Sequence, residues 1–227
     1  MHLGLIGGLG PAATEYYYRG LVNAYAALDE TLELTIVNAS SRVLLANLIK
    51  GAASEQAAIF RGFAERLKGA GADVAIVTSL AGHFCIRELE NVSPLPVVNA
   101  LPALDRHFGQ LGVNRVGLLG TRTVMESKLY GGISSAEVVF PQGADLDTVH
   151  ETYVATAIAG SATNEQKELL IGMGEKLCRE QGADAVALAG TDLFLAFDGA
   201  ACGYRVIDCA RVHIDDIVAH ALSDASE

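Results

Sequence analysis

The chain has 227 residues, of which 51 % are hydrophobic, and a formal net charge of −11 at pH 7. This size allows one large domain or two small ones, and the high hydrophobic content argues against intrinsic disorder. The acidic balance and the lack of a Lys/Arg cluster exclude nucleic acid as an expected partner, and no apolar run approaches the roughly 20 residues needed to cross a bilayer.

The N-terminus becomes Gly-rich without a preceding basic segment, which argues against a signal peptide. The cysteines have no metal-ligand spacing, so we expect reduced thiols, no metal site, no membrane partner and a cytoplasmic location. They are Cys85, Cys178, Cys202 and Cys209.

Short apolar runs alternate with longer helical stretches along the chain. The runs predict buried strands at residues 2–7, 32–38, 73–78, 96–99, 115–120, 136–140, 184–189 and 204–208. The stretches predict helices at residues 11–27, 54–70, 100–110, 123–131, 147–159, 164–181 and 209–223. This alternation is typical of right-handed βαβ units and of an open parallel sheet with helices on both faces.

Two motifs recur later in the chain, in the same order and at nearly the same spacing. Residues 3–7 (Leu-Gly-Leu-Ile-Gly) return as residues 116–120 (Val-Gly-Leu-Leu-Gly). Residues 71–77 (Gly-Ala-Asp-Val-Ala-Ile-Val) return as residues 182–188 (Gly-Ala-Asp-Ala-Val-Ala-Leu). The repeat predicts an α/β fold of two similar doubly wound halves, each with a parallel four-stranded sheet, related by a pseudo-twofold axis.

The first half is expected to comprise residues 1–99 with a returning C-terminal helix in residues 209–227, and the second half residues 100–208. Ligands of open parallel sheets bind beyond the carboxyl ends of the strands. We therefore expect the working site in a cleft between the halves, formed by the residues just after each strand.

The first strand runs into a Gly-rich turn, Gly7-Gly8-Leu9-Gly10, that leads to a helix N-terminus. The turn either holds a small carboxylate through backbone N–H groups, Gly8 among them, or simply connects strand and helix. A dinucleotide site is disfavoured, because the G-x-G-x-x-G spacing is absent and the second strand ends in Asn38 instead of an acid. Arg42 is either a carboxylate clamp or a solvated surface residue.

The third strand and the later segment that repeats it are each followed by candidate site residues. The third strand is followed by Ser79-Leu80-Ala81-Gly82-His83, and the repeated segment by Ala189-Gly190-Thr191-Asp192. The repeat makes Ser79 and Gly190 equivalent, so we expect them on opposite walls of one cleft. We also expect a small anion at the N–H groups after Gly8 and Thr121, near Thr191.

These segments resemble the aspartate/glutamate racemase superfamily, and most of all its aspartate racemase branch. Residues 6–14 (Ile-Gly-Gly-Leu-Gly-Pro-Ala-Ala-Thr) match the family's opening G-G-M-G-P-x-A-T. Residues 120–123 (Gly-Thr-Arg-Thr) with Tyr130, and residues 206–208 (Val-Ile-Asp) with His213, match its later segments. The resemblance runs from end to end. It implies the two-sheet fold and cofactor-free chemistry, in which one thiolate removes the α-proton of an amino acid and a thiol on the opposite face returns one.

The sequence departs from the family at both thiols. The family's C-N-T-A-H begins with Ser79 here, and Gly190 replaces the cysteine of its G-C-T-E. A Ser hydroxyl titrates far above neutrality and Gly has nothing to titrate, so ordinary racemisation of aspartate or glutamate by two thiols is not expected. Gly190 is expected to leave a gap on its wall, and Leu80 replaces the Asn that would bind substrate.

Four other residues near the strand ends are candidates for chemistry or for the lining of the cleft. His83 either orients ligand or transfers a proton, or it caps a helix start. Asp192 is either a general base or the cap of the following helix. Cys85 is either a displaced thiol or, as we favour, a small buried side chain, and Cys209 would line the cleft floor.

The leading hypothesis is a cofactor-independent enzyme that binds an amino acid or a related small carboxylate and transfers a proton next to the carboxylate, as an isomerase or a lyase variant. Its catalytic groups would be Ser79, His83 and Asp192. Its substrate-binding residues would be Gly8, Arg42, Thr121, Thr123, Gly190 and Thr191. The alternative is a catalytically inactive paralogue that binds a small carboxylate as a sensor or partner. Whether the chain forms a homodimer stays open.

Overall fold

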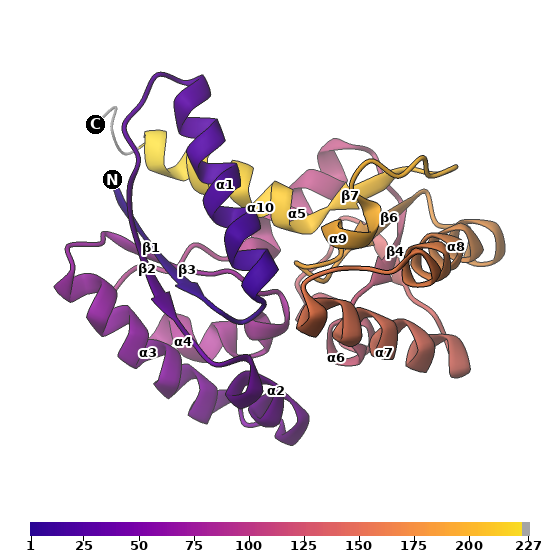
Figure 1. The fold of residues 1–227 in the computed structure, drawn as a ribbon, viewed down its shortest axis with the longest axis horizontal. Helices are drawn as coiled ribbons and strands as arrows, with labels where there is room; N and C mark the ends of the chain where they lie inside the picture. The colour runs from indigo at the N-terminus through magenta and orange to yellow at the C-terminus, as the bar shows by residue number, and fades with distance from the viewer. Residues whose placement is uncertain (224–227) are drawn as a thin grey trace. The chain divides into compact units, whose positions relative to one another are not determined.

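The computed structural model describes residues 1–223, which group into two compact units (Figure 1). Unit 1 comprises residues 1–99 and the C-terminal segment from His213, and unit 2 comprises residues 100–212. Each unit contains its own parallel sheet with flanking helices, which confirms the predicted α/β fold with two parallel-sheet halves. Among the described residues, no helix is both long enough and apolar enough to span a bilayer.

Unit 1 has a parallel sheet in the order β2-β1-β3. Its strands are β1 (His2–Gly7), β2 (Glu33–Asn38) and β3 (Val74–Val77). The predicted fourth strand at residues 96–99 is reduced to one bridge between Val97 and Ala75. Pro94 and Pro96 precede Val97, and a Pro has no N–H to donate to a ladder, so continuous pairing does not develop there.

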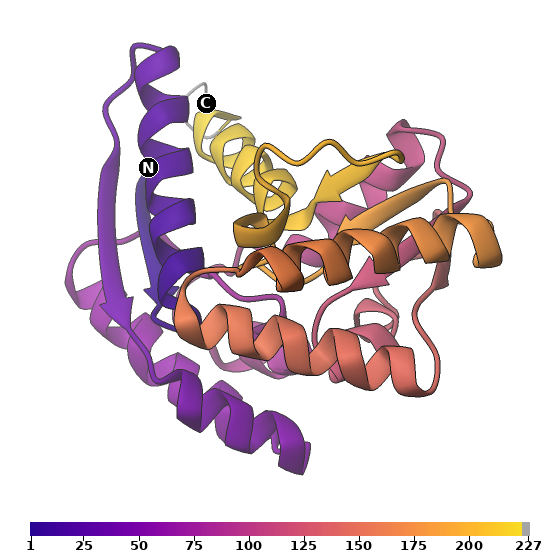
Figure 2. The same cartoon turned by 45° about the vertical axis from the view of Figure 1, so that its right-hand side comes forward.

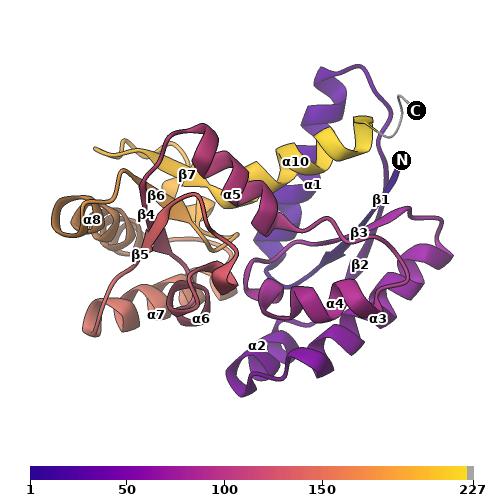
Figure 3. The same cartoon turned by 180° about the vertical axis from the view of Figure 1, so that it is seen from behind.

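Helices cover both faces of this sheet, with α1 and α10 on one side and α3 and α4 on the other (Figures 1 and 3). The helical segments are α1 (Pro11–Ala27), α2 (Ser41–Lys50), α3 (Ala53–Gly69), the 3-10 helix η1 (Ala81–Cys85), α4 (Ile86–Val92) and α10 (Cys209–Ser223), which belongs to unit 1 from His213 onward. The sequence analysis missed α2 and α4. Helix α2 has clear end signals, since the Ser40 side chain accepts the Val43 N–H at 3.4 Å and Gly51 ends the helix in the left-handed conformation.

Unit 2 has a parallel sheet in the order β5-β4-β6-β7. Its strands are β4 (Arg115–Leu119), β5 (Glu137–Val139), β6 (Ala185–Leu188) and β7 (Val206–Asp208). This order repeats that of unit 1, with Val97 in the place of β7. The sequence repeat therefore correctly paired β1 with β4 and β3 with β6.

The helical segments of unit 2 are α5 (Ala100–Gln110), α6 (Arg122–Glu126), the 3-10 helix η2 (Leu129–Gly131), α7 (Ala144–Ala159), α8 (Asn164–Gln181) and α9 (Phe194–Phe197). The single helix predicted at residues 123–131 is wrong. Lys128, Leu129 and Tyr130 all have positive φ angles, of 53°, 55° and 58°, which breaks the segment into α6 and η2.

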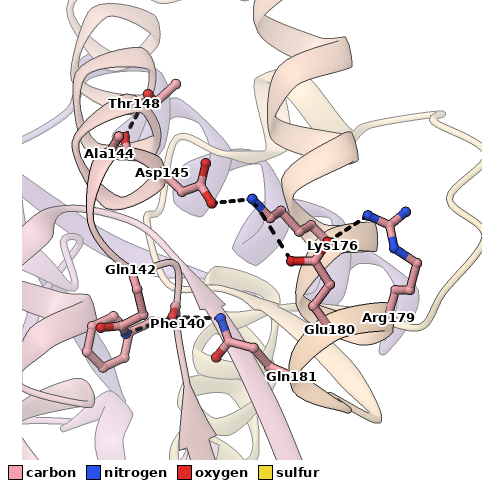
Figure 4. A network of polar contacts seen from close by, with 9 residues as sticks. All are labelled: Phe140, Gln142, Ala144, Asp145, Thr148, Lys176, Arg179, Glu180 and Gln181. Carbon is pink, nitrogen blue, oxygen red and sulfur yellow. Dashed lines mark hydrogen bonds and ion pairs between the residues drawn. The ribbon is translucent and has the colours of Figure 1, made fainter.

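Helices α7 and α8 run side by side (Figures 1 and 2), and polar contacts join them (Figure 4). Nζ of Lys176 on α8 donates to Oδ2 of Asp145 on α7 at 2.5 Å. The same Nζ lies 4.0 Å from Oε2 of Glu180, one turn further along α8. Gln181 donates to the carbonyl oxygen of Phe140, just before α7, at 3.1 Å. These partly exposed contacts each contribute little free energy, but they link α7 and the segment before it to α8.

Candidate active site

The Gly-rich turn after β1 is closed by its own hydrogen bonds. Gly8 has a φ of +77°, and a Cβ there would lie 2.2 Å from Oδ1 of Asn38. The Gly8 N–H donates to Oγ1 of Thr14 at 2.8 Å, and this hydroxyl donates to the Gly10 carbonyl at 3.1 Å. The N–H of Gly8, which we expected to hold an anion, therefore already has an acceptor within the turn.

Ser79 and His83 come together directly after β3. The Nδ1–H of His83 donates to the Ser79 carbonyl oxygen at 2.7 Å, because a carbonyl can only accept. The Ser79 hydroxyl oxygen accepts the Gly82 N–H at 3.2 Å. Burial lowers the pKa of His83 to about 4, while its bond to Ser79 acts in the opposite direction. His83 is therefore a neutral imidazole with a fixed tautomer near pH 7.

A second buried histidine, His213, packs edge to face against His83 with 5.9 Å between the ring centroids. Nε2 of His213 donates to the carbonyl of Val98 at 3.1 Å, so its Nδ1 accepts the Tyr17 hydroxyl at 2.9 Å. Burial and the neighbouring His83 lower the pKa of His213 to about 3. The sequence analysis noted His213 as a family match but missed Tyr17, whose position on α1 is that of an ordinary core residue.

The two buried cysteines near the strand ends are protonated thiols at neutral pH. Burial and the charge of Glu88 raise the pKa of Cys85 to about 12, and its Sγ donates to the Gly82 carbonyl at 3.4 Å. Burial and the nearby Asp208 raise the pKa of Cys209 well above its ordinary value. The geometry favours Cys85 as a small buried side chain, and gives no support to a displaced thiolate.

Arg42 is exposed in the first turn of α2. Its exposure is that of a solvated surface residue. Its predicted role as a carboxylate clamp stays a prediction.

In unit 2, the end of β4 is occupied by capping interactions. Thr121 is the N-cap of α6, and its hydroxyl oxygen accepts the Val124 N–H at 3.4 Å. The Arg122 N–H donates to Nδ1 of His150 at 3.2 Å, a residue of α7 that the sequence analysis missed. Thr123 follows on α6 and is half-exposed. Two of the N–H groups expected to hold an anion after Thr121 therefore already have side-chain acceptors.

The end of β6 carries Gly190, Thr191 and Asp192, all buried. It packs closely on the end of β4, since a Cβ at Gly120 would lie 2.8 Å from the Ala189 carbonyl oxygen. The expected gap beside Gly190 does not exist. A Cβ at this position would lie 2.5 Å from Cζ and 2.9 Å from the hydroxyl oxygen of Tyr153, a residue of α7.

Tyr153 connects this filled position to Asp192. Its hydroxyl donates to Oδ2 of Asp192 at 3.4 Å, and 6 % of the residue is exposed. Burial and then the charge of Asp192 raise the pKa of Tyr153 well above 10, although hydrogen bonds to the Asp192 backbone and the Thr191 side chain act in the opposite direction. The structure thus brings together a carboxylate, a protonated phenol and a buried threonine beside Gly190.

The N-cap of α9 is Leu193, which forms no side-chain cap hydrogen bond. That Asp192 caps this helix stays an alternative to its role as a base. Tyr153 and His150 were missed because their importance depends on where α7 packs. The available signal was their spacing of three residues on one predicted helix, which places both on the same face.

Comparison with known proteins gives a consistent family assignment. The family model described as "Asp/Glu/Hydantoin racemase" matches residues 6–217. A proposed Asp/Glu racemase from Yersinia pestis has 25% identity and a TM-score of 0.82, with 98% of this chain and 100% of that chain covered. An aspartate racemase homologue from Pyrococcus horikoshii has 25% identity and a TM-score of 0.78, covering 97% of this chain and 98% of that one.

The fold is also similar to that of a glutamate racemase from Francisella tularensis, whose structure was determined in complex with D-glutamate. The identity is 14%, the TM-score is 0.65, and the alignment covers 99% of this chain and 82% of that chain. At this identity the likeness concerns the fold alone.

Proposed function

This chain belongs to the Asp/Glu/Hydantoin racemase family, and we propose that it is a cofactor-independent enzyme that binds an amino acid or a related small carboxylate and transfers a proton at the carbon next to the carboxylate. The observation that carries this proposal is the contact of Asp192 with Tyr153 directly beside Gly190. A carboxylate and a phenol can both move protons, so acid-base chemistry at this position does not require a thiol.

The proposal assigns Asp192 the role of base, because a carboxylate is the strongest basic group at the end of β6. Ser79 and His83 belong to the same proposed machinery, where the Nδ1–H of His83 is held by the Ser79 carbonyl and sets the orientation of the ring. The proposed substrate-binding residues are Gly8, Arg42, Thr121, Thr123, Gly190 and Thr191.

An amino acid is the preferred substrate class for two reasons. The family description names Asp and Glu, and the glutamate racemase of similar fold binds D-glutamate. Cytoplasmic action and assembly into a homodimer are further parts of the proposal, to be tested by cell fractionation and by light scattering.

A second candidate function is that of an inactive paralogue that binds a small carboxylate as a sensor or partner. Ser79 and Gly190 favour it, because neither can act as a thiolate. His83 also favours it, since an imidazole with a pKa of about 4 is a weak base near neutrality.

Solvent deuterium incorporation at the α-carbon separates the two candidates. The chain would be incubated in D2O with each enantiomer of aspartate, glutamate and alanine, and with methylsuccinate, and the α-proton signal followed by NMR. The enzyme proposal expects incorporation with at least one compound, and its loss in Asp192→Asn. A compound that raises the melting temperature without incorporating deuterium would favour the inactive binder, since native-state binding must stabilise the fold.

A further inference from the structure

Position 190 is filled by a side chain that comes from another element. Tyr153 lies in the middle of α7, on the buried face that also carries Leu146, Val149 and Thr156. Its ring atoms Cζ and Cε2 lie 2.5 Å and 2.6 Å from where a Cβ of residue 190 would be. No side chain at position 190 fits beside this ring without a shift, so Gly190 and Tyr153 form a complementary pair.

The phenol places a hydroxyl close to where a thiol at position 190 would lie. The Tyr153 oxygen is 2.9 Å from the Cβ position of residue 190, a separation comparable with the reach of a short side chain. The same hydroxyl donates to Asp192 at 3.4 Å. The Tyr153 hydroxyl therefore lies close to the space that a side chain at position 190 would occupy, although it comes from a distant part of the sequence.

Tyr153 is suited to give a proton and unsuited to take one. Burial and the charge of Asp192 raise its pKa well above 10, so the phenol keeps its proton near pH 7. A carbanion next to a carboxylate is a far stronger base than a phenolate, so a phenol can protonate it. Oδ2 of Asp192 lies 3.4 Å from the Tyr153 hydroxyl oxygen and can accept a proton in turn.

We propose that Tyr153 delivers the proton to the substrate α-carbon in place of the absent thiol, and that Asp192 removes the α-proton and passes it back to Tyr153. This inference rests on the proposed function. Asp192 breaks the Cα–H bond and forms an O–H bond, leaving the electron pair on the α-carbon. That pair takes the Tyr153 proton, and the resulting phenolate recovers a proton from the Asp192 carboxyl group. Both residues return to their starting states, and no other reactant is consumed.

The first test asks whether Tyr153 occupies the space at position 190. The backbone of Gly190 lies outside the left-handed region, so Gly190→Ala introduces a contact without backbone strain. We expect Gly190→Ala to lower the melting temperature by roughly 3–10 °C. In a Tyr153→Ala background the same substitution should have almost no effect. An equal drop in both backgrounds would overturn the inference.

The second test separates the hydroxyl from the ring. Tyr153→Phe keeps the ring that fills position 190, so the melting temperature should change little, and removes the proposed proton donor. We expect deuterium incorporation to fall about 100-fold or more, the usual size of a lost general acid. Tyr18→Phe, at an exposed tyrosine of α1, is the matched control and should leave incorporation unchanged.

The outcomes distinguish the inference from the proposed function. An active wild type with a fully active Tyr153→Phe variant would overturn the role of Tyr153 and leave the proposed function standing. A wild type that incorporates no deuterium into any compound tested would overturn the proposed function, and the role of Tyr153 with it.

Discussion

His83 and His213 lie edge to face within unit 1, and each is held in one tautomer by a backbone carbonyl, Ser79 for the first and Val98 for the second. Two adjacent imidazoles are compatible with burial only while both are neutral, because neighbouring positive charges away from water would repel one another. The pair therefore links the strand end of β3 to helix α10 by contacts that depend on protonation.

We expect the free energy of unfolding to decrease as the pH falls below about 6.5, the ordinary pKa of histidine. In the native state the pKa of His83 is about 4 and that of His213 about 3, so the unfolded chain binds more protons between these values and 6.5. Each unit of difference is worth about 1.4 kcal/mol, so the loss builds up through this window. Urea unfolding at about pH 7.5, 6 and 5 measures it.

His213→Gln should weaken this pH dependence, because it removes one of the two buried imidazoles. His220→Gln, at an exposed position on the same helix, is the control and should keep the wild-type slope. A wild-type stability that stays level from pH 6.5 down to about pH 5 would contradict the assignment of two neutral buried histidines.

Gly8→Ala should destabilise unit 1 by about 2–4 kcal/mol, since it combines a positive φ with a clash against a neighbouring side chain. The φ is +77°, and the new Cβ would meet Asn38 Oδ1 at 2.2 Å. Gly62→Ala, in the interior of α3 where nothing lies within 4 Å of the new Cβ, should instead stabilise the chain by about 0.5–1 kcal/mol. Chemical denaturation of both variants measures the difference, and equal effects would show that the turn is not constrained as described.

The positions of β1, β3, β4 and β6 could be predicted from sequence because these strands are short buried runs that the repeat identifies twice. The fourth strand of unit 1 could not, since Pro94 and Pro96 limit pairing at Val97 to one bridge. Helix α2 was missed because the residues after Asn38 were considered only as strand-end candidates for ligand binding, Arg42 among them.

The candidate site was predictable only where it follows the strands. Ser79, Gly190 and Asp192 come directly after β3 and β6, so the repeat located them. Tyr153 reaches Gly190 through the packing of α7, from a distant part of the sequence, and a tyrosine on the buried face of a helix looks like any other core residue. Local periodicity carries no information about such a contact.

Introducing cysteine at both position 79 and position 190 should not produce two-thiol activity while Tyr153 is present. In the double variant Ser79→Cys/Gly190→Cys, the Cβ of the new cysteine at position 190 would lie 2.5 Å from Cζ of Tyr153. The cysteine and the tyrosine ring would therefore compete for the same space. Adding Tyr153→Ala removes the ring, so the triple variant should incorporate deuterium into aspartate or glutamate at least about tenfold faster than the double variant. Equal rates in the two variants would show that Tyr153 does not block the position.

The wild type should exchange the α-hydrogen of its substrate faster than it inverts the configuration, and should racemise aspartate and glutamate slowly if at all. Inversion needs a base on one face of the substrate and an acid on the other. The Tyr153 hydroxyl oxygen and Oδ2 of Asp192 are 3.4 Å apart in unit 2, so in the proposed mechanism both groups act on one face of the substrate. Ser79 cannot act as a thiolate does, because a hydroxyl titrates several pKa units higher, at about 1.4 kcal/mol per unit. Its hydroxyl also already accepts the Gly82 N–H, and His83 is a weak base with a pKa of about 4.

The measurement combines two readouts on one sample in D2O. NMR follows deuterium at the α-carbon, and chiral chromatography follows the enantiomeric ratio, starting from each enantiomer in turn. We expect deuterium to accumulate while most molecules keep their configuration, with both rates lost in Asp192→Asn. The triple variant Ser79→Cys/Gly190→Cys/Tyr153→Ala, which has a thiol at each of the two equivalent positions, should bring the rates of exchange and inversion closer together. Equal rates of exchange and inversion in the wild type would show that an acid or base works on the second face, and would contradict a one-sided Asp192–Tyr153 pair.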